Sequence, residues 1–192
     1  CTVCLYNLLN DFITVWVGSD LLLDNLTVTV LCVQFFMETA RIISTSYTNG
    51  CGLFVKDKIR PVIEATINLV VSIIMTNWLG IAGVFVGTIV SHLCTVFWRE
   101  PYLLYKYEFE RSLQEYWIYY MISALFTITL SKLISWISIF VFSEVCSFIG
   151  WFLKAALIFI GGNIIIVICM CRNRDFLFYK EMLLKKLKLR KD

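Results

Sequence analysis

Histidine is nearly absent from this sequence of 192 residues, which contains only His92. A zinc site or a similar metal site needs several soft ligands close together. The eight cysteines offer the short pairs Cys1-x-x-Cys4 and Cys169-x-Cys171, with no histidine beside either pair. A lone cysteine pair is a weak motif, and free cysteine often serves as a small apolar residue. The sequence therefore predicts no metal site and no cofactor, and it indicates a packing role for the cysteines.

Motifs of catalysis are lacking as well. The chain has no nucleophile elbow, no glycine-rich phosphate loop and no metal-binding helix motif. It has a formal net charge of +3 but no recognisable nucleic-acid-binding module. The first residue is Cys1 rather than Met, and no signal-peptide pattern precedes the first apolar stretch. We expect a protein that is not an enzyme, that binds no nucleic acid and whose sequence is a piece of a longer chain.

Apolar residues dominate the sequence. They make up 59% of it, charged residues make up 16%, and the mean hydropathy is +0.79. A soluble domain of this size rarely reaches such an average, because its surface must be polar. Several apolar runs approach the ~20 residues that cross a bilayer as a helix, whereas a transmembrane barrel would show short alternating segments. The sequence predicts an all-α, polytopic transmembrane helical bundle.

We expect about five complete spans, preceded at residues 1–10 by the end of a truncated helix. Pro61 should open the second span, because proline favours the first turn of a helix, and Asn49-Gly50 should form a turn before it. The charged and aromatic segment 99–116 is typical of a helix that lies on the membrane surface. Residues 1–171 then form the transmembrane part, and residues 172–192 form a basic amphipathic tail. The expected spans are residues 26–44, 61–78, 81–98, 117–140 and 149–170.

The distribution of basic residues predicts the orientation in the membrane. Segments 46–60, 99–116 and 172–192 all contain lysine and arginine, and the tail alone has eight of them against three acidic residues. The opposite loops hold Asp11, Asp20, Asp24 and Glu144, with no lysine or arginine. Because loops rich in lysine and arginine stay in the cytoplasm, we expect a cytoplasmic C-terminus. The tail should bind anionic membrane lipids there.

Polar side chains recur along one face of three successive predicted spans, at helical spacing. Ionisable groups cost ~2.5–3.5 kcal/mol each at the centre of a transmembrane helix, so they normally face a bundle interior or a water-filled cavity. We expect the faces of the first two spans to line a substrate-binding cavity. The side chains are Gln34, Glu38 and Arg41 in the first span, Glu64, Asn68 and Ser72 in the second, and Thr88, Ser91, His92 and Thr95 in the third.

Simpler explanations remain open for several of these residues. Arg41 and Glu64 lie near span ends, where long side chains can reach the interface. Asn68 and Ser72 are also suited to plain hydrogen bonds between helices. His92 is suited either to a structural hydrogen bond or to a proton relay.

Two lysines form a second candidate site. Lys132 and Lys154 lie eleven residues to either side of the turn near Ser143, so antiparallel helices should place both ammonium groups at a similar depth. Two cations at one level are suited to an anionic ligand, and the alternative is that both reach outward to the interface. In contrast, Gly83, Gly87 and Ser91 are small residues spaced four apart, which favours close helix packing.

A family resemblance rests on two stretches, "RPVIEATINLVVSIIMTNWLGIAGVFVGTIVS" and "FWREPYLLYKY". Both closely resemble the C-terminal part of bacterial oligosaccharide flippases, the Wzx-type polysaccharide exporters of the MOP superfamily. The stretches "NDFITVWVGSDLLL" and "RNRDFLFYKEML" are loosely similar to the same family. The resemblance covers nearly all of the chain.

The resemblance implies twelve to fourteen helices in two lobes around a central cavity, of which this chain supplies the C-terminal lobe. It implies a multi-pass protein of the bacterial cytoplasmic membrane that flips undecaprenyl-diphosphate-linked oligosaccharide, with the N-terminal lobe as its partner. The polar faces would then bind sugar, and Arg41, Lys132 or Lys154 would bind phosphate. The alternatives are a fragment of a MATE-like cation or drug antiporter, and a truncated membrane scaffold without transport activity.

Overall fold

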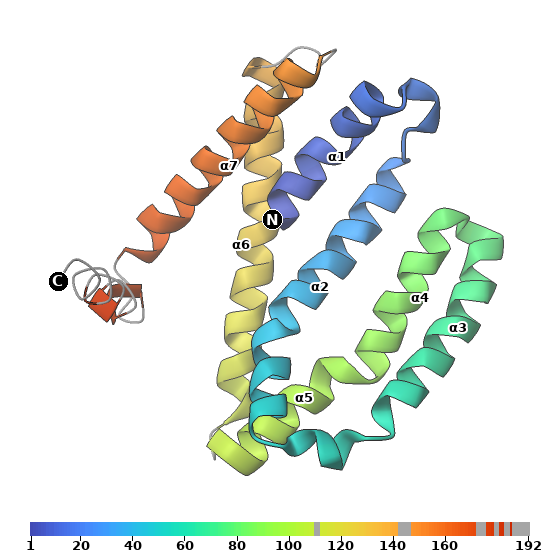
Figure 1. The fold of residues 1–192 in the computed structure, drawn as a ribbon, viewed down its shortest axis with the longest axis vertical. Helices are drawn as coiled ribbons and strands as arrows, with labels where there is room; N and C mark the ends of the chain where they lie inside the picture. Colours follow the sequence, from blue (N-terminus) through green and yellow to red (C-terminus); the bar gives the residue numbers. More distant parts are fainter. Residues whose placement is uncertain (110–111, 142–146, 172–175, 179–180, 183–184, 186–192) are drawn as a thin grey trace.

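The structure is a computed structural model that describes residues 1–109, 112–141, 147–171 and, in the tail, 176–178, 181–182 and 185. Every regular element in this described part is a helix (Figure 1). The elements are α1 (Thr2–Trp16), η1 (Ser19–Leu21), α2 (Asn25–Gly50), η2 (Leu53–Asp57), α3 (Arg60–Leu79), α4 (Ile81–Cys94), α5 (Val96–Leu104), the π-helical segment η3 (Tyr105–Phe109), α6 (Leu113–Val141) and α7 (Phe148–Met170).

Five helical stretches within the described residues are long and apolar enough to cross a membrane. They are α2, α3, the stretch Ile81–Phe109 that comprises α4, α5 and η3, Leu113–Ser138 of α6, and α7. The 15-residue α1 is shorter and precedes them. Large apolar side chains remain exposed along these helices, as at Trp78 and Phe152, which suits a lipid-facing surface. The predicted all-α fold with about five spans is confirmed to this extent.

The end of α2 differs from the prediction. The helix continues to Gly50 instead of ending near Ser44, so Asn49-Gly50 is its last turn and not a separate loop. The chain reverses at Gly52, whose φ of +71° suits glycine. Ser44 and Thr48 are both buried, and the Thr48 hydroxyl donates to the Ser44 carbonyl at 2.9 Å. Tertiary burial therefore overrides the local turn preference.

The third predicted span also differs, because it is interrupted. α4 ends at Cys94, Thr95 leaves the helical conformation, and α5 begins at Val96. The predicted helix over residues 99–116 is found in part, and Leu103 and Leu104 pack with Leu53 of η2. That this helix lies on the membrane surface stays a prediction.

α3 and α4 form a tight hairpin at one edge of the bundle (Figure 1). Gly80 makes the turn with a φ of +58°. A Cβ at Gly83 would lie 2.4 Å from the Met75 backbone, and a Cβ at Gly87 would lie 2.1 Å from the Ser72 hydroxyl oxygen. The predicted packing role of the small residues is confirmed. As predicted, Pro61 stands in the first turn of α3.

The other side of the bundle joins α1 to α6 and α7, and α2 lies between this group and the hairpin. Leu8, Leu130, Ile134 and Ile158 form its buried core. The end of α2, η2, the start of α3 and α5 gather at one end of the molecule, while η1 and the α3–α4 turn lie at the other (Figure 1). The basic segments at 56–60 and 99–106 therefore share one end.

The acidic end carries the start of α2. Asp24 precedes this helix, and the Thr27 hydroxyl donates a hydrogen bond to its carboxylate. This bond holds the pKa of the Asp24 carboxyl below its usual range, because it favours the charged form. The predicted turn near Ser143, Glu144 and most of the predicted tail lie outside the described residues.

Candidate functional site

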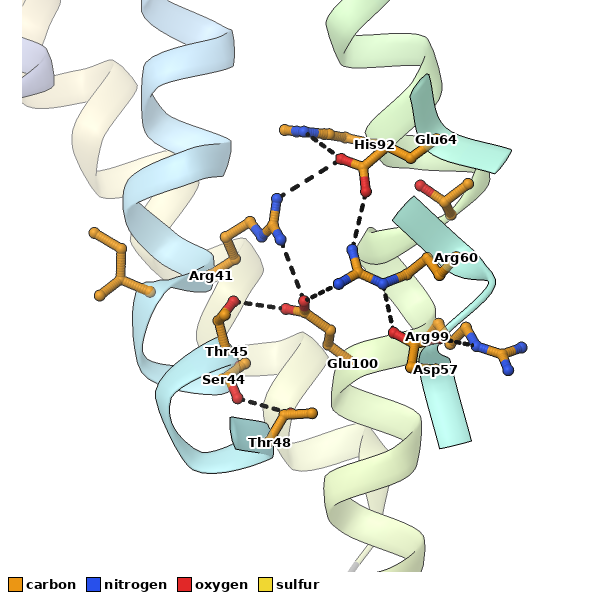
Figure 2. A network of polar contacts seen from close by, with 12 residues as sticks. Arg41, Ser44, Thr45, Thr48, Asp57, Arg60, Glu64, His92, Arg99 and Glu100 are labelled. Atoms are coloured by element: carbon orange, nitrogen blue, oxygen red, sulfur yellow. Dashed lines mark hydrogen bonds and ion pairs between the residues drawn. The ribbon is translucent and has the colours of Figure 1, made fainter. Parts of the chain in front are cut away.

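Charged and polar side chains from five elements meet near the basic end of the bundle (Figure 2). We call this group the polar cluster. It consists of Glu38, Arg41 and Thr45 from α2, Asp57 from η2, Arg60 and Glu64 from α3, His92 from α4, and Arg99 and Glu100 from α5.

Glu100 is the most deeply buried member, with only 1% of its surface exposed. Its Oε1 lies 3.2 Å from Nη2 of Arg41 and 3.2 Å from Nη2 of Arg60. The Thr45 hydroxyl donates to its other oxygen, Oε2, at 2.9 Å. Both carboxylate oxygens therefore have partners, as a buried charge requires.

Arg60 holds three carboxylates with its three nitrogens. Its Nε bonds Asp57, its Nη1 lies 2.9 Å from Glu64 Oε2, and its Nη2 reaches Glu100. These acids come from η2, α3 and α5, so one planar guanidinium ties three elements together. Asp57 is buried and also accepts a bond from Nε of Arg99.

His92 connects two carboxylates from different helices. Its Nε2 lies 3.1 Å from Glu38 Oε1 and 3.0 Å from Glu64 Oε1. A single N–H at this nitrogen can donate to only one of these oxygens at full strength. Arg41 Nη1 supports the same two acids at 3.5 Å and 3.9 Å. Two acidic side chains thus compete for one imidazole nitrogen at the junction of α2, α3 and α4.

The charges of the cluster nearly balance. Among the residues that the structure describes, three arginines face four carboxylates and one histidine. Burying charges costs several kcal/mol per ion, and their mutual attraction often only offsets that cost. The cluster is therefore weak evidence for stability. It is better evidence for a function that needs charge inside a membrane-spanning bundle.

The structure brings three of the predicted site residues together, Glu38, Arg41 and Glu64. Asp57, Arg60 and Glu100 also belong to the cluster, but the predicted polar faces did not include them. Glu100 lies in a segment that we expected on the membrane surface, and the break at Thr95 removes it from the helical period of α4. The only sequence signal was an acid directly between Arg99 and Pro101.

Asn68 and Ser72 belong to helix packing. The Ser72 hydroxyl donates to Asn68 Oδ1 at 2.9 Å and lies where a side chain at Gly87 would go. The Ser72 hydroxyl also lies 3.4 Å from the Val84 carbonyl of α4, which favours the alternative of a hydrogen bond between helices. Gln34 is half-buried, and its Oε1 is buried with no hydrogen-bond partner in the described part of the chain.

The two lysines of the second predicted site have different partners. Lys154 is buried, and its Nζ donates to Asp11 Oδ2 at 2.6 Å. Lys132 is exposed, with its Nζ 5.8 Å from the centre of the Tyr6 ring. It lies at the edge of a mainly apolar cavity of about 440 Å³ between α1, α2, α4 and α6. Asp11, which we expected in a loop, lies in α1 and neutralises Lys154.

We expect the Asp11–Lys154 pair to be energetically coupled. In a double-mutant cycle with Asp11→Asn and Lys154→Met, the double variant should lose less stability than the sum of the single variants. The coupling energy should be about 0.5–3 kcal/mol. The measurement is the free energy of unfolding in mixed micelles. The control cycle combines Asp11→Asn with Lys132→Met and should be additive. Coupling in the control cycle alone would contradict the pairing.

The described residues contain no group of three or more His, Cys, Asp or Glu side chains arranged to hold a metal ion. Comparisons with protein-family models, with curated proteins and with solved structures find no match. Family membership therefore rests on the resemblance of the sequence stretches alone and stays a proposal.

Proposed function

We propose that the chain is part of a membrane transporter that flips undecaprenyl-diphosphate-linked oligosaccharide for polysaccharide biosynthesis. The observation that supports this is the polar cluster, in which Glu100 and its arginine partners lie between membrane-spanning helices. Ionisable groups inside such helices typically mark a substrate or ion pathway. Within this proposal, the chain is the C-terminal lobe of a MOP-type exporter and the N-terminal lobe completes the cavity.

The proposed location is the bacterial cytoplasmic membrane, with the basic end of the bundle and the tail in the cytoplasm. The segment from η2 to the start of α3 and the helix α5 share that end and carry Lys56, Lys58, Arg60 and Arg99. The segment from η1 to the start of α2 lies at the other end and carries Asp20 and Asp24, which supports this orientation by the positive-inside rule. The tail would contact anionic lipid headgroups there.

Glu38 is the member of the cluster best placed to exchange partners with a substrate. Its side chain is 44% exposed, compared with 19% for Glu64 and 2% for Glu100. Sugar hydroxyls can accept and donate hydrogen bonds, so a sugar can take the place of His92 or Arg41 at this carboxylate. Release and re-formation of these bonds would couple substrate binding to movement of α2 against α3 and α4.

Glu38→Gln should reduce export roughly tenfold or more, because a hydrogen bond to a charged group contributes about 1.5–3 kcal/mol. The measurement is lipid-linked oligosaccharide in the outer leaflet of cells that produce the native protein, at matched membrane abundance. The control is Val70→Leu, a change at an exposed apolar residue of α3. Equal export by both variants would contradict a transport role for the cluster and would favour a scaffold.

A cation antiporter is the second candidate. It is favoured by the meeting of Glu38 and Glu64 at one nitrogen of His92, an arrangement that can take up and release a proton. Transport of a small cation that depends on a proton or sodium gradient, and that is lost in Glu64→Gln, would support it. Neighbouring glycosyltransferase genes would favour oligosaccharide export instead.

A further inference from the structure

A second polar feature lies beside the polar cluster and faces outward. It is a cavity of about 370 Å³ between η2, the start of α3 and the α4–α5 junction. This volume is within the range of about 300–1,000 Å³ that is typical of ligand sites. Four cationic side chains line it, which are Lys56, Lys58, Arg60 and Arg99. Lys132 and Lys154, the two lysines that we expected to form an anion site, do not line this cavity.

Two of these cations are available to a ligand. Lys58 is exposed and has no carboxylate within ion-pair distance among the described residues. Arg99 has a side chain that is 41% exposed, and it uses Nε for Asp57 and Nη2 for the Lys56 carbonyl at 3.3 Å. Its Nη1 has no partner in the described part of the protein.

The other two cations are already engaged. All three side-chain nitrogens of Arg60 contact carboxylates of the polar cluster. Lys56 lies with its Nζ 3.3 Å from the centre of the Tyr107 ring. Among the described residues, Asp57 is the one acid that contacts Arg99, and it is buried and shared with Arg60. The described lining of the cavity therefore carries a surplus of positive charge.

The remaining wall of the cavity is apolar and faces the outside of the bundle. Ile59, Ile63 and Trp98 line it, and they are 63%, 49% and 48% exposed. α3 has no buried residue, so this side of the hairpin is an outer surface. Tryptophan is enriched where a membrane protein meets the headgroup region. Cations next to an exposed apolar wall match a ligand that carries a phosphate on a hydrocarbon chain.

We propose that this cavity binds the phosphate or diphosphate group of a membrane lipid, with Lys58 and Arg99 on the phosphate and Trp98 and Ile63 against its chain. Lysine acts on phosphate as a point charge, and arginine adds directed N–H donors. The ligand is either a phospholipid of the bilayer or a polyprenyl diphosphate carrier, since both present this chemistry. The inference goes beyond the transport proposal, because binding here requires no transport.

The test measures binding to the native protein in micelles of a neutral detergent. A fluorescent short-chain phosphatidylglycerol is the probe, and fluorescence polarisation gives its affinity. Lys58→Gln should weaken binding about fivefold, because a basic residue near lipid phosphate contributes ≈1 kcal/mol. Arg99→Gln should do at least the same. Lys58→Gln leaves every described ion pair intact, so it keeps the test valid if Arg99→Gln misfolds.

Lys106→Gln is the matched control, since Lys106 lies at the same end and outside the cavity, with its Nζ 2.7 Å from the Tyr102 hydroxyl. It removes the same charge and should leave the affinity unchanged. Equal losses in the Lys58 and Lys106 variants would show general electrostatic attraction and would overturn the site, as would a failure of the probe to bind.

The chain-binding wall has its own test. Trp98→Ala should lower the affinity for the lipid probe. It should leave unchanged the inhibition constant of inorganic pyrophosphate, measured by competition with the probe. No effect of Trp98→Ala on the probe would overturn the lipid part of the proposal. Displacement of the probe by farnesyl diphosphate at a lower concentration than by dimyristoyl phosphatidylglycerol would identify a polyprenyl diphosphate ligand. The reverse order would identify a phospholipid, and both orders support the site.

Discussion

Arg60→Met should lower the free energy of unfolding by about 3–5 kcal/mol, the range for a buried ion pair that loses one partner. Methionine keeps most of the length of the side chain and removes its charge. Asp57, Glu64 and Glu100 would all lose their shared cation. Asp57 belongs to η2 and Glu100 to α5, so the change also removes ion pairs that join α3 to these two elements. The measurement is unfolding of the native protein by a denaturing detergent in mixed micelles.

Two further variants make this result specific. Adding Glu100→Gln to Arg60→Met should restore part of the stability, because it removes the charge of a buried carboxylate that keeps only Arg41 as a cationic partner among the described residues. Lys58→Met removes an exposed cation two residues away and should change stability by less than about 1 kcal/mol. If Arg60→Met lowers the free energy of unfolding no more than Lys58→Met does, the ion pairs of Arg60 do not stabilise the bundle.

Gly83→Ala should destabilise the α3–α4 hairpin by about 1–3 kcal/mol, the usual range for overpacking. The new Cβ would lie 2.4 Å from the carbonyl carbon and oxygen of Met75 and from the amide nitrogen of Thr76. These are backbone atoms, so no side-chain rotation relieves the clash and the two helices must separate. Because α3 packs mainly against α4, the cost falls on a single interface.

Gly161→Ala is the control for this change, measured by the same unfolding assay. Gly161 also lies inside a helix, and a Cβ there would meet nothing within 4 Å. Alanine is the better helix former, so this variant should be neutral or slightly more stable. Equal stability of the two alanine variants would contradict the close approach of α3 and α4.

Several features could be predicted from the sequence because they depend on local composition. Runs of about twenty apolar residues predict spanning helices, since backbone hydrogen bonds must be satisfied inside the segment in lipid. Pro61 predicts the start of α3, and Gly83 and Gly87 predict close packing, because each effect acts within one or two turns of its residue. The shared polar face of Glu38 and Arg41 follows from helical spacing alone.

Other features were decided only by the tertiary structure. The sequence contains Asp11 and Lys154 but does not indicate their pairing, since the two residues are 143 positions apart and meet only when α1 packs on α7. Glu100 becomes a buried site residue because the break at Thr95 turns α5 toward α2. The end of α2 moves from Ser44 to Gly50 because Ser44 and Thr48 become buried.

The sequence by itself therefore determined the approximate number and location of the apolar helices, the start of α3 and the polar faces of the first spans. The tertiary structure decided which charges neutralise each other and which, like Lys58 and Arg99, keep donors for a ligand. The physical reason is range. Helix formation and hydropathy depend on neighbours within a few turns, whereas the partner of a charge depends on helices that the chain brings together from far apart.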